Sequence, residues 1–171
     1  MRKKARKIRV LLLDVDGVLT DGAIAINDRG EEIKTFNVRD GQGIKLLRES
    51  GVEVGLISAR SSKAVSCRAR ELGIHIVYQG VRDKAGAFER MKARRGYKNC
   101  EVAYVGDDLM DLPLLQRAGL AITVKDGWQG LKSRVDYVTT HKGGRGAVRE
   151  VAELLLRARD NWRKVVSEYL A

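Results

Sequence analysis

Five aspartates follow directly after two largely apolar runs, and their carboxylates are the groups in this sequence best suited to chemistry. They are Asp14, Asp16, Asp107, Asp108 and Asp111. The runs that precede them, residues 8–13 and 102–105, are typical of buried parallel strands. Ligands of open α/β sheets bind beyond the carboxyl ends of the strands, so we expect these carboxylates to gather at one edge of a sheet.

So many carboxylates in one site repel one another unless a cation neutralises them. An all-oxygen set of ligands, without His or Cys, favours Mg²⁺. Ser58 and Lys84, which follow two further apolar runs, add a hydroxyl and an ammonium to the same edge. This combination predicts phosphoryl transfer, in which catalysis depends on positioning and charge neutralisation. The sequence contains no Gly-x-x-x-x-Gly-Lys-Ser/Thr motif, which excludes nucleotide hydrolysis of the Walker type.

The spacing of the first two aspartates suggests a division of labour. Side chains two residues apart at the end of a strand can reach one substrate and still do different jobs. We expect Asp14 to attack phosphorus, and Asp16 to protonate the leaving alcohol and then to deprotonate a water. Gly17 lets the backbone turn there and brings its amide toward the phosphate oxygens.

Strand-like and helix-like segments alternate along most of the chain. The expected strands cover residues 8–13, 52–57, 74–78, 102–105, 120–124 and 135–138. The expected helices cover residues 41–49, 62–72, 84–95 and 111–118. This alternation predicts βαβ units, and therefore an α/β fold with a Rossmann-like parallel sheet flanked by helices.

Two segments depart from the alternation. Residues 21–36 hold two extended pieces around the turn signal Asn27-Asp28-Arg29-Gly30, which predicts a small β-hairpin flap. Residues 147–170 carry apolar side chains at spacings of three and four, which predicts one long C-terminal helix. That helix packs on its own domain or contacts another subunit. No linker or repeat is visible, so we expect a single domain over residues 10–171.

The charge of the chain is concentrated at its start. The sequence has 171 residues and a formal net charge of +11, of which residues 1–9 carry six cations and no acid. We expect this basic arm to be a solvated, frayed terminus. A non-catalytic nucleic-acid-binding module is the remote alternative. Only two cysteines occur and no apolar stretch has the length of a membrane span, so we expect a cytoplasmic protein without a membrane partner.

Four motifs, in order along the chain, resemble those of the haloacid dehalogenase superfamily of phosphatases. The first is Asp14-Val15-Asp16-Gly17-Val18-Leu19-Thr20-Asp21-Gly22, the second Ser58, the third Lys84 and the fourth Gly106-Asp107-Asp108-Leu109-Met110-Asp111. The resemblance implies Mg²⁺ held by the carboxylates of Asp14 and Asp107 and by the backbone carbonyl of Asp16. It also implies that Ser58 and Lys84 contact the phosphoryl group, with Asp108 and Asp111 supporting the site from behind.

Three further segments are similar to the 3-deoxy-D-manno-octulosonate 8-phosphate (KDO 8-phosphate) phosphatases. They are residues 36–41, 78–80 and 143–150. This resemblance implies hydrolysis of KDO 8-phosphate to KDO and phosphate through an aspartyl-phosphate. It also implies the absence of a large cap domain, and a homotetramer in which a neighbouring subunit helps to close the site.

The substrate depends on residues away from the catalytic edge. Arg60 in the triplet Ser58-Ala59-Arg60 matches an arginine usual in these phosphatases, and we expect it to bind the substrate carboxylate. Arg145, in a glycine-rich segment, is a second candidate for substrate binding. The alternatives are a phosphatase for 9-carbon keto-sugar-acid (KDN or sialic acid) 9-phosphates and a broad sugar phosphatase.

Overall fold

The computed structural model describes residues 1–170 and contains a six-stranded sheet that forms the middle layer of the molecule. All neighbouring strands in it are parallel, in the order β5-β4-β1-β6-β7-β8. The strands are β1 (Val10–Leu13), β4 (Glu53–Ile57), β5 (Ile76–Tyr78), β6 (Val102–Gly106), β7 (Leu120–Thr123) and β8 (Tyr137–Val138). The predicted α/β class is confirmed.

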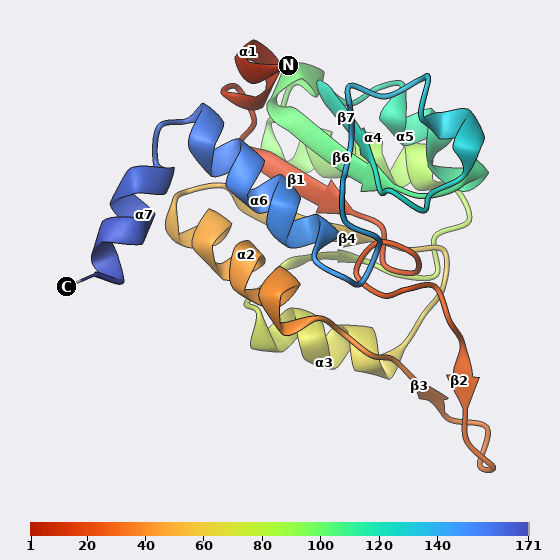
Figure 1. Ribbon diagram of the computed structural model, residues 1–171. Coiled ribbons are helices and arrows are strands. Elements are labelled where there is room, and N and C mark those ends of the chain that lie inside the picture. Colours follow the sequence, from red (N-terminus) through yellow and green to blue (C-terminus); the bar gives the residue numbers. More distant parts are fainter. Residues whose placement is uncertain (171) are drawn as a thin grey trace.

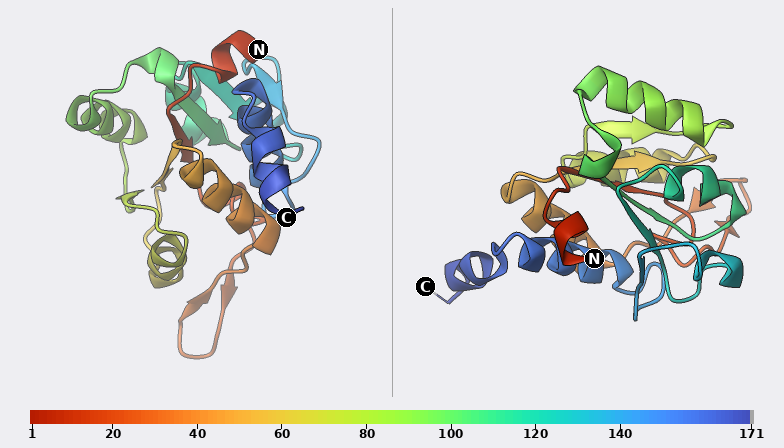
Figure 2. Two further views of the ribbon diagram at one scale, coloured as in Figure 1. Left: turned by 90° about the vertical axis from the view of Figure 1, so that its left-hand side faces the viewer. Right: turned by 90° about the horizontal axis from the view of Figure 1, so that it is seen from above.

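Helices cover both faces of the sheet (Figure 2). They are α1 (Arg2–Ala5), α2 (Val38–Glu49), α3 (Lys63–Glu71), α4 (Lys84–Arg95), α5 (Leu112–Leu115), α6 (Ala147–Ala158) and α7 (Trp162–Glu168). Three short 3₁₀ turns complete the described elements: η1 (Asn99–Glu101), η2 (Leu109–Asp111) and η3 (Gln129–Leu131).

Alternate side chains of β1 enter two separate cores. Leu11 and Leu13 pack with α2, α3 and α6, whereas Val10 and Leu12 pack with α4 and α5. This alternation follows from the two-residue period of a strand that is covered on both faces. The sheet is therefore sealed on both sides, and only its edges and loops are free to bind a ligand.

The chain order places a crevice at the ends of β1 and β6. From β1 the chain passes to β4 and β5 on one side, and it later returns to β6, β7 and β8 on the other side. The loops that follow β1 and β6 therefore diverge, and such a switch point is where open α/β sheets bind ligands. Asp14 and Asp107, the residues that follow these two strands, border this crevice.

The hairpin stands out from the body of the molecule (Figure 1). Its strands β2 (Ala25–Ile26) and β3 (Glu32–Ile33) are antiparallel and only two residues long. The side chain of Asn27 closes the turn by accepting the backbone N–H groups of Arg29 and Glu31. The predicted small hairpin is confirmed. It is the segment that separates β1 from α2, where a cap domain would have to be inserted.

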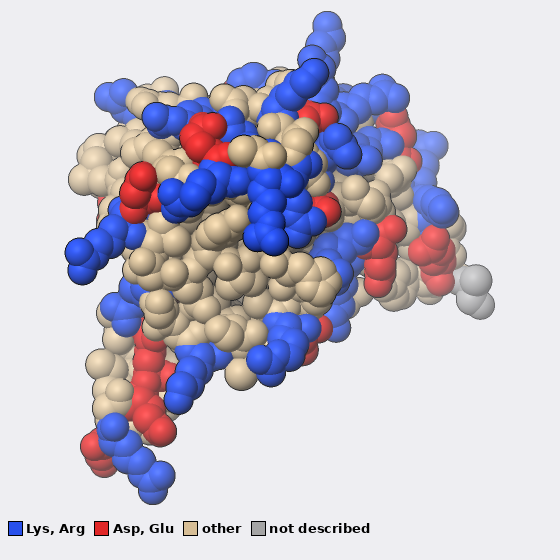
Figure 3. Space-filling model, turned by 180° about the vertical axis from the view of Figure 1, so that it is seen from behind, with Lys and Arg blue, Asp and Glu red and all other residues tan. Residues whose placement is uncertain are grey.

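The basic arm is ordered, contrary to the expected frayed terminus. Ala5 and Ile8 are fully buried in the core. Arg2 lies 2.9 Å from Asp160, and Lys4 lies 2.6 Å from Asp136. Burial of two apolar side chains and ion pairs with residues distant in sequence hold this segment against the domain, so Arg2 and Lys4 are paired within the fold. Figure 3 shows that Lys and Arg residues elsewhere are interspersed with acidic residues on the rear face.

The single C-terminal helix predicted for residues 147–170 is wrong. The chain forms α6 and α7 with a break between them, where Asp160 adopts a positive φ of 62°. The break directs α7 away from the axis of α6 (Figure 1), while Trp162 still stacks against Arg149 and Arg157 of α6. Aspartate tolerates this left-handed conformation better than most residues, so the break falls at Asp160. Among the described residues, no helix combines the length and apolar character needed to span a membrane.

Candidate active site

Asp14 lies in the crevice at the carboxyl end of β1 and is almost completely buried. Its backbone N–H donates to the carbonyl of Val105 on β6, which fixes the start of the loop at 3.0 Å. The chain then turns tightly, because the N–H groups of Val18, Leu19 and Thr20 all donate to the carbonyl of Val15. This turn presents the Asp14 carboxylate to the space between β1 and β6.

Gly17 makes room in that turn for the second carboxylate. It has a positive φ of 86°, and a Cβ at this position would lie 2.0 Å from Oδ2 of Asp107. A Cβ here would displace the Asp107 carboxylate, in a backbone conformation that side chains disfavour. The glycine of the first motif therefore lets the Asp107 carboxylate lie against the first loop.

Asp111 organises the loop after β6 from behind. Its Oδ2 accepts the backbone N–H groups of Asp107 at 2.8 Å and Asp108 at 3.2 Å. Its Oδ1 accepts the hydroxyl of Tyr104 at 2.6 Å and the ammonium of Lys84 at 2.7 Å. Both oxygens of this buried carboxylate are thus fully used, so it orients its neighbours. Asp108 is exposed and receives the N–H of Leu109 at 2.7 Å, which caps η2.

Lys84 is the cation of the crevice. It begins α4, is buried, and places Nζ 3.0 Å from Oδ1 of Asp14 and 2.7 Å from Oδ1 of Asp111. Burial disfavours its ammonium, but the charges of Asp14 and Asp111 outweigh that effect and raise the pKa of Lys84 above its usual value. Lys84 therefore supplies a fixed positive charge beside Asp14.

One ammonium does not balance three neighbouring carboxylates. Burial raises the pKa of Asp14 to about 6, against the opposing effect of Lys84. Burial, together with the charges of Asp14 and Asp111, raises the pKa of Asp107 to about 8. Carboxyl groups with such high pKa values are stabilised as anions when a cation binds between them.

The geometry fits a hard divalent cation. Carboxylate oxygens of Asp14, Asp107 and Asp111 lie within 4.8 Å of one another. Because the oxygens of Asp111 are occupied by four donors, Asp14 and Asp107 are the carboxylates best able to ligate an ion. An all-oxygen set of ligands of this kind suits Mg²⁺.

Ser58 lies at the end of β4, beside β1, and is buried. Its N–H donates to the carbonyl of Tyr78 at 2.9 Å, and its Oγ accepts the backbone N–H of Arg60 at 3.2 Å. The Ser58 hydroxyl thus keeps its hydrogen for another acceptor, and the residue stands at the same edge of the sheet as Asp14.

Asp16 has a different environment from Asp14. Its carboxylate is ion-paired with Lys34 of the hairpin and lies 3.6 Å from Nε of Arg60. Sequence reasoning did not identify Lys34 or its neighbour Glu32 as part of the site. The available signal was the alternation Glu32-Ile33-Lys34 in the predicted hairpin, which places two charged side chains on one face.

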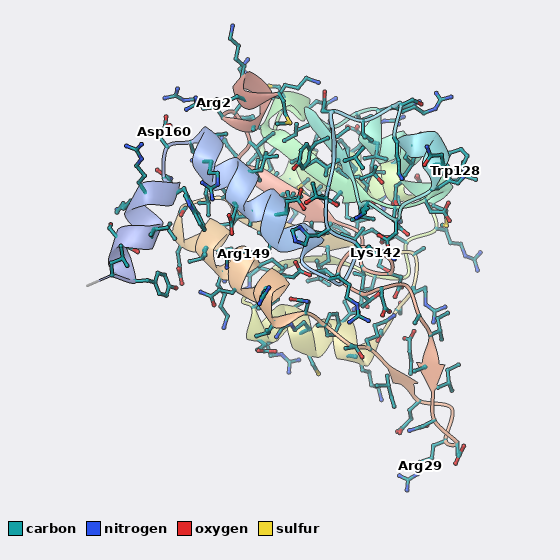
Figure 4. The ribbon with its side chains drawn as sticks, in the orientation of Figure 1. Arg2, Arg29, Trp128, Lys142, Arg149 and Asp160 are labelled. Atoms are coloured by element: carbon teal, nitrogen blue, oxygen red, sulfur yellow. The ribbon has the colours of Figure 1, made fainter. Side chains whose placement is uncertain are left out.

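The glycine-rich segment closes one side of the Asp14 loop. The N–H of Gly144 donates to the carbonyl of Val18 at 2.9 Å, and a Cβ on Gly143 would lie 1.7 Å from the carbonyl oxygen of Gly17. Figure 4 shows Lys142 of this segment near the end of β1. Arg145 points outward and lies 3.1 Å from Asp21. It does not contact the carboxylate cluster.

Two acidic residues that sequence reasoning missed hold this segment in place. Asp40 of α2 is buried and accepts the N–H groups of Gly146 at 3.2 Å and Arg149 at 2.7 Å, which caps α6. Glu150 accepts donors from Thr140, His141 and Tyr137, and lies 2.7 Å from Nδ1 of His141. Burial opposes these hydrogen bonds, but they prevail and lower the pKa of Glu150 to about 2.

Comparisons with known proteins agree with this geometry. The haloacid dehalogenase-like hydrolase family matches residues 73–151. The 3-deoxy-D-manno-octulosonate 8-phosphate phosphatase KdsC of Escherichia coli strain K12 is 50% identical over 155 residues, which cover 91% of this chain and 82% of that protein. KdsC of Yersinia pestis is 46% identical over 92% of this chain and 84% of that protein.

Solved structures extend the likeness to the fold. The 3-deoxy-D-manno-octulosonate 8-phosphate phosphatase of Moraxella catarrhalis, in complex with magnesium, phosphate and KDO, superposes with a TM-score of 0.96 at 42% identity. The match covers 98% of this chain and 97% of that one. The Yersinia pestis enzyme superposes with a TM-score of 0.93 at 45% identity, over 95% of this chain and 88% of that one. The family suggested by the motifs is therefore confirmed, and the chain belongs to the KdsC family of haloacid dehalogenase-like phosphatases.

Proposed function

We propose that this protein is a Mg²⁺-dependent phosphatase that hydrolyses KDO 8-phosphate to KDO and phosphate. The observation that carries the proposal is the buried Asp14 carboxylate at the end of β1, with the Lys84 ammonium 3.0 Å from it and Asp107 beside it. This is the arrangement that an aspartate nucleophile for phosphorus requires. The KdsC relatives support the choice of substrate.

The carboxylates of Asp14 and Asp107 and the backbone carbonyl of Asp16 would hold Mg²⁺. When bound, the cation supplies the positive charge that lets an anionic carboxylate approach an anionic phosphate. The remaining charge compensation comes from Lys84, and the Ser58 hydroxyl donates a hydrogen bond to a phosphate oxygen. The Gly17 amide faces the same phosphate.

The reaction proceeds in two displacements at phosphorus. In the first, an Asp14 oxygen forms a bond to phosphorus while the bond from phosphorus to the sugar oxygen breaks. Asp16, which enters this step in its protonated form, donates that proton to the leaving oxygen. In the second, water attacks the aspartyl-phosphate, Asp16 takes the proton of the water, and the bond between Asp14 and phosphorus breaks. Phosphate leaves and both aspartates return to their starting states.

Arg60 and Arg145 are the proposed contacts to the rest of the substrate. Arg60 lies 3.6 Å from Asp16 and 2.7 Å from Glu32 of the hairpin, so it is placed to bind the carboxylate of a phosphorylated sugar acid whose phosphate is held at Asp14. Arg145 projects from the glycine-rich segment and suits a contact across a subunit boundary. Phosphatases for 9-carbon keto-sugar-acid 9-phosphates remain the alternative that Arg60 disfavours.

We also propose a homotetramer located in the cytoplasm. The hairpin exposes more than half of the surface of Ile24, Ile26 and Ile33, and an apolar surface of this kind favours contact with another protein surface. Both cysteines, Cys67 and Cys100, are free, which suits a reducing compartment. The arm's cations are partly paired within the fold, so a nucleic-acid partner is not proposed.

We expect Asp14→Asn to lose at least about 10³-fold in kcat, because an amide oxygen cannot form the phosphoryl bond. Phosphate release from KDO 8-phosphate measures the loss. The melting temperature serves as the control and is expected to stay the same or rise, because the variant removes a buried charge. Near-wild-type turnover of Asp14→Asn would show that another residue is the nucleophile.

The affinity for Mg²⁺ is expected to fall as the pH is lowered from 8 to 6. The pKa of Asp107 is about 8, so below that pH a proton occupies the group that must ionise to bind the cation. The apparent affinity should weaken by up to about tenfold per pH unit. Titration calorimetry in two buffers of different ionisation enthalpy measures both the affinity and the proton release. A pH-independent affinity without proton release would show that Asp107 is already ionised in the metal-free protein over this range.

The substrate preference follows from the position of Arg60. We expect kcat/KM to be higher for KDO 8-phosphate than for KDN 9-phosphate. Arg60→Met should reduce kcat/KM for KDO 8-phosphate by about 10–100-fold, since a charge-assisted hydrogen bond to the carboxylate is lost. Steady-state kinetics on both substrates measure this preference. If the wild type has a lower kcat/KM for KDO 8-phosphate than for KDN 9-phosphate, the 9-carbon alternative is favoured.

The tetramer should depend on the exposed isoleucines of the hairpin. Size-exclusion chromatography with light scattering should give the mass of four chains for the wild type. Ile26→Asp combined with Ile33→Asp, which changes one exposed isoleucine on each face of the hairpin, should give smaller species, because the charges oppose burial of these positions. Arg29→Asp, at the hairpin tip (Figure 4), is the control that changes charge without changing an isoleucine. A wild-type mass of one chain would contradict the proposal.

A further inference from the structure

Four charged side chains at the base of the hairpin form a closed arrangement of alternating sign. Lys34 is ion-paired with Asp16 and lies 3.0 Å from Oε1 of Glu32. Nη2 of Arg60 lies 2.7 Å from the same Oε1, and its Nε lies 3.6 Å from Oδ2 of Asp16. Each cation therefore faces both carboxylates, and the group links the hairpin to the loops that follow β1 and β4.

Lys34 is the buried member of this group. Its side chain is only 1% exposed, although it lies on a hairpin that projects from the body. A buried ammonium is costly unless it is fully paired, and here two carboxylates supply the pairing. Ile33, between the two charged residues, points to the opposite, exposed face, as the two-residue period of a strand requires. The hairpin therefore presents Glu32 and Lys34 together toward the site.

Arg60 is the solvent-exposed member of this group. Its side chain is 46% exposed, and the two contacts hold it through Nη2 and Nε. A guanidinium has five N–H donors, so donors remain for an incoming anion. Glu32 fixes one edge of the guanidinium, and the plane of the group is thereby set before a substrate arrives. A preorganised fork of this kind loses less side-chain entropy on binding a carboxylate.

We propose that Glu32 is a positioning residue that holds Arg60 in the orientation that binds the substrate carboxylate, with Lys34 as the buried anchor of Glu32. The inference rests on the proposed function, because that function assigns the carboxylate to Arg60. Glu32 touches neither the phosphate site around Lys84 nor the cluster formed by Asp14, Asp107 and Asp111. Its effect is therefore directed at the sugar-acid end of the substrate, and it contributes to selectivity between phosphate esters.

Loss of Glu32 leaves the group with two cations and one carboxylate. Lys34 and Arg60 would then share the single carboxylate of Asp16, and the two cations would repel each other across it. Arg60 is the exposed partner and is free to turn toward solvent, whereas Lys34 is confined. The guanidinium would have to be reordered each time a substrate binds, which raises KM for a substrate that carries a carboxylate.

The experiment compares KDO 8-phosphate with p-nitrophenyl phosphate, a phosphate ester without a carboxylate, for the wild type, Glu32→Ala and Glu32→Gln. We expect Glu32→Ala to raise KM for KDO 8-phosphate by about tenfold and to change kcat less. The substrate ratio, defined as kcat/KM for KDO 8-phosphate divided by kcat/KM for p-nitrophenyl phosphate, should fall by a similar factor. Glu32→Gln keeps an acceptor oxygen for Arg60 and should recover part of the ratio. Glu31→Ala is the matched control, because Glu31 is exposed and bonded to Asn27 at the hairpin turn.

The outcomes separate this inference from the proposed function. If the wild type does not prefer KDO 8-phosphate, the proposed function fails, whatever the variants do. If the wild type has the preference and both Glu32 variants keep the substrate ratio, the positioning role is wrong. An equal loss on both substrates would also overturn it, since Glu32 would then act through Asp16 or through stability. A selective loss in Glu32→Ala that is partly recovered in Glu32→Gln and absent in Glu31→Ala supports it.

Discussion

The mutual repulsion of buried carboxylates is the constraint on which the site depends. Asp14, Asp107 and Asp111 bring their oxygens within 4.8 Å of one another, and Asp14 and Asp111 are buried while Asp107 is partly buried. Lys84 neutralises part of this charge and four donors satisfy Asp111, but the pKa values of Asp14 and Asp107 remain raised. The fold therefore holds the carboxylates close together at a cost in free energy, and a divalent cation bound between them would relieve that cost.

The fold supplies that geometry by steric means as well as by charge. β1 and β6 are adjacent and parallel, so the loops after them leave the sheet side by side and then diverge. Gly17 allows the Asp107 carboxylate to lie against the first loop, and Gly143 allows the glycine-rich segment to pack on its carbonyl. Asp40, from α2, fixes the same segment through the start of α6. Three parts of the chain thus meet where a Cβ could not be accommodated.

The order of strands and helices was predictable because apolar runs and polar turns are local signals. The helix expected at 84–95 has the same bounds in the structure, and Lys84 is at its start. Glu32, Lys34 and Asp40 were not predicted as site residues, although Glu32 and Lys34 alternate in the predicted hairpin and Asp40 lies in the segment 36–41. Their roles depend on partners far away in sequence, such as Arg60 and Arg149, and a local pattern does not identify those partners. The break at Asp160 was missed because the apolar stripe continues through it, and Trp162, beyond the break, still stacks against Arg149 of α6. The basic arm is held by burial of Ala5 and Ile8 and by ion pairs with Asp136 and Asp160, which lie more than a hundred residues away.

Asp14 and Asp16 are two residues apart, yet the structure gives them distinct surroundings. Asp14 is buried beside Lys84 and faces the carboxylate cluster, whereas Asp16 is partly exposed and faces Lys34 and Arg60. The environment therefore separates the two carboxylates into a nucleophile held against a fixed cation and a proton carrier held by the hairpin. The partners of Asp16 include Arg60, the proposed reader of the substrate carboxylate. Asp16, the proposed proton carrier, is thus in contact with Arg60, the residue proposed to select the substrate. A hairpin of two-residue strands is sufficient to make that connection because it delivers both Glu32 and Lys34 from one face.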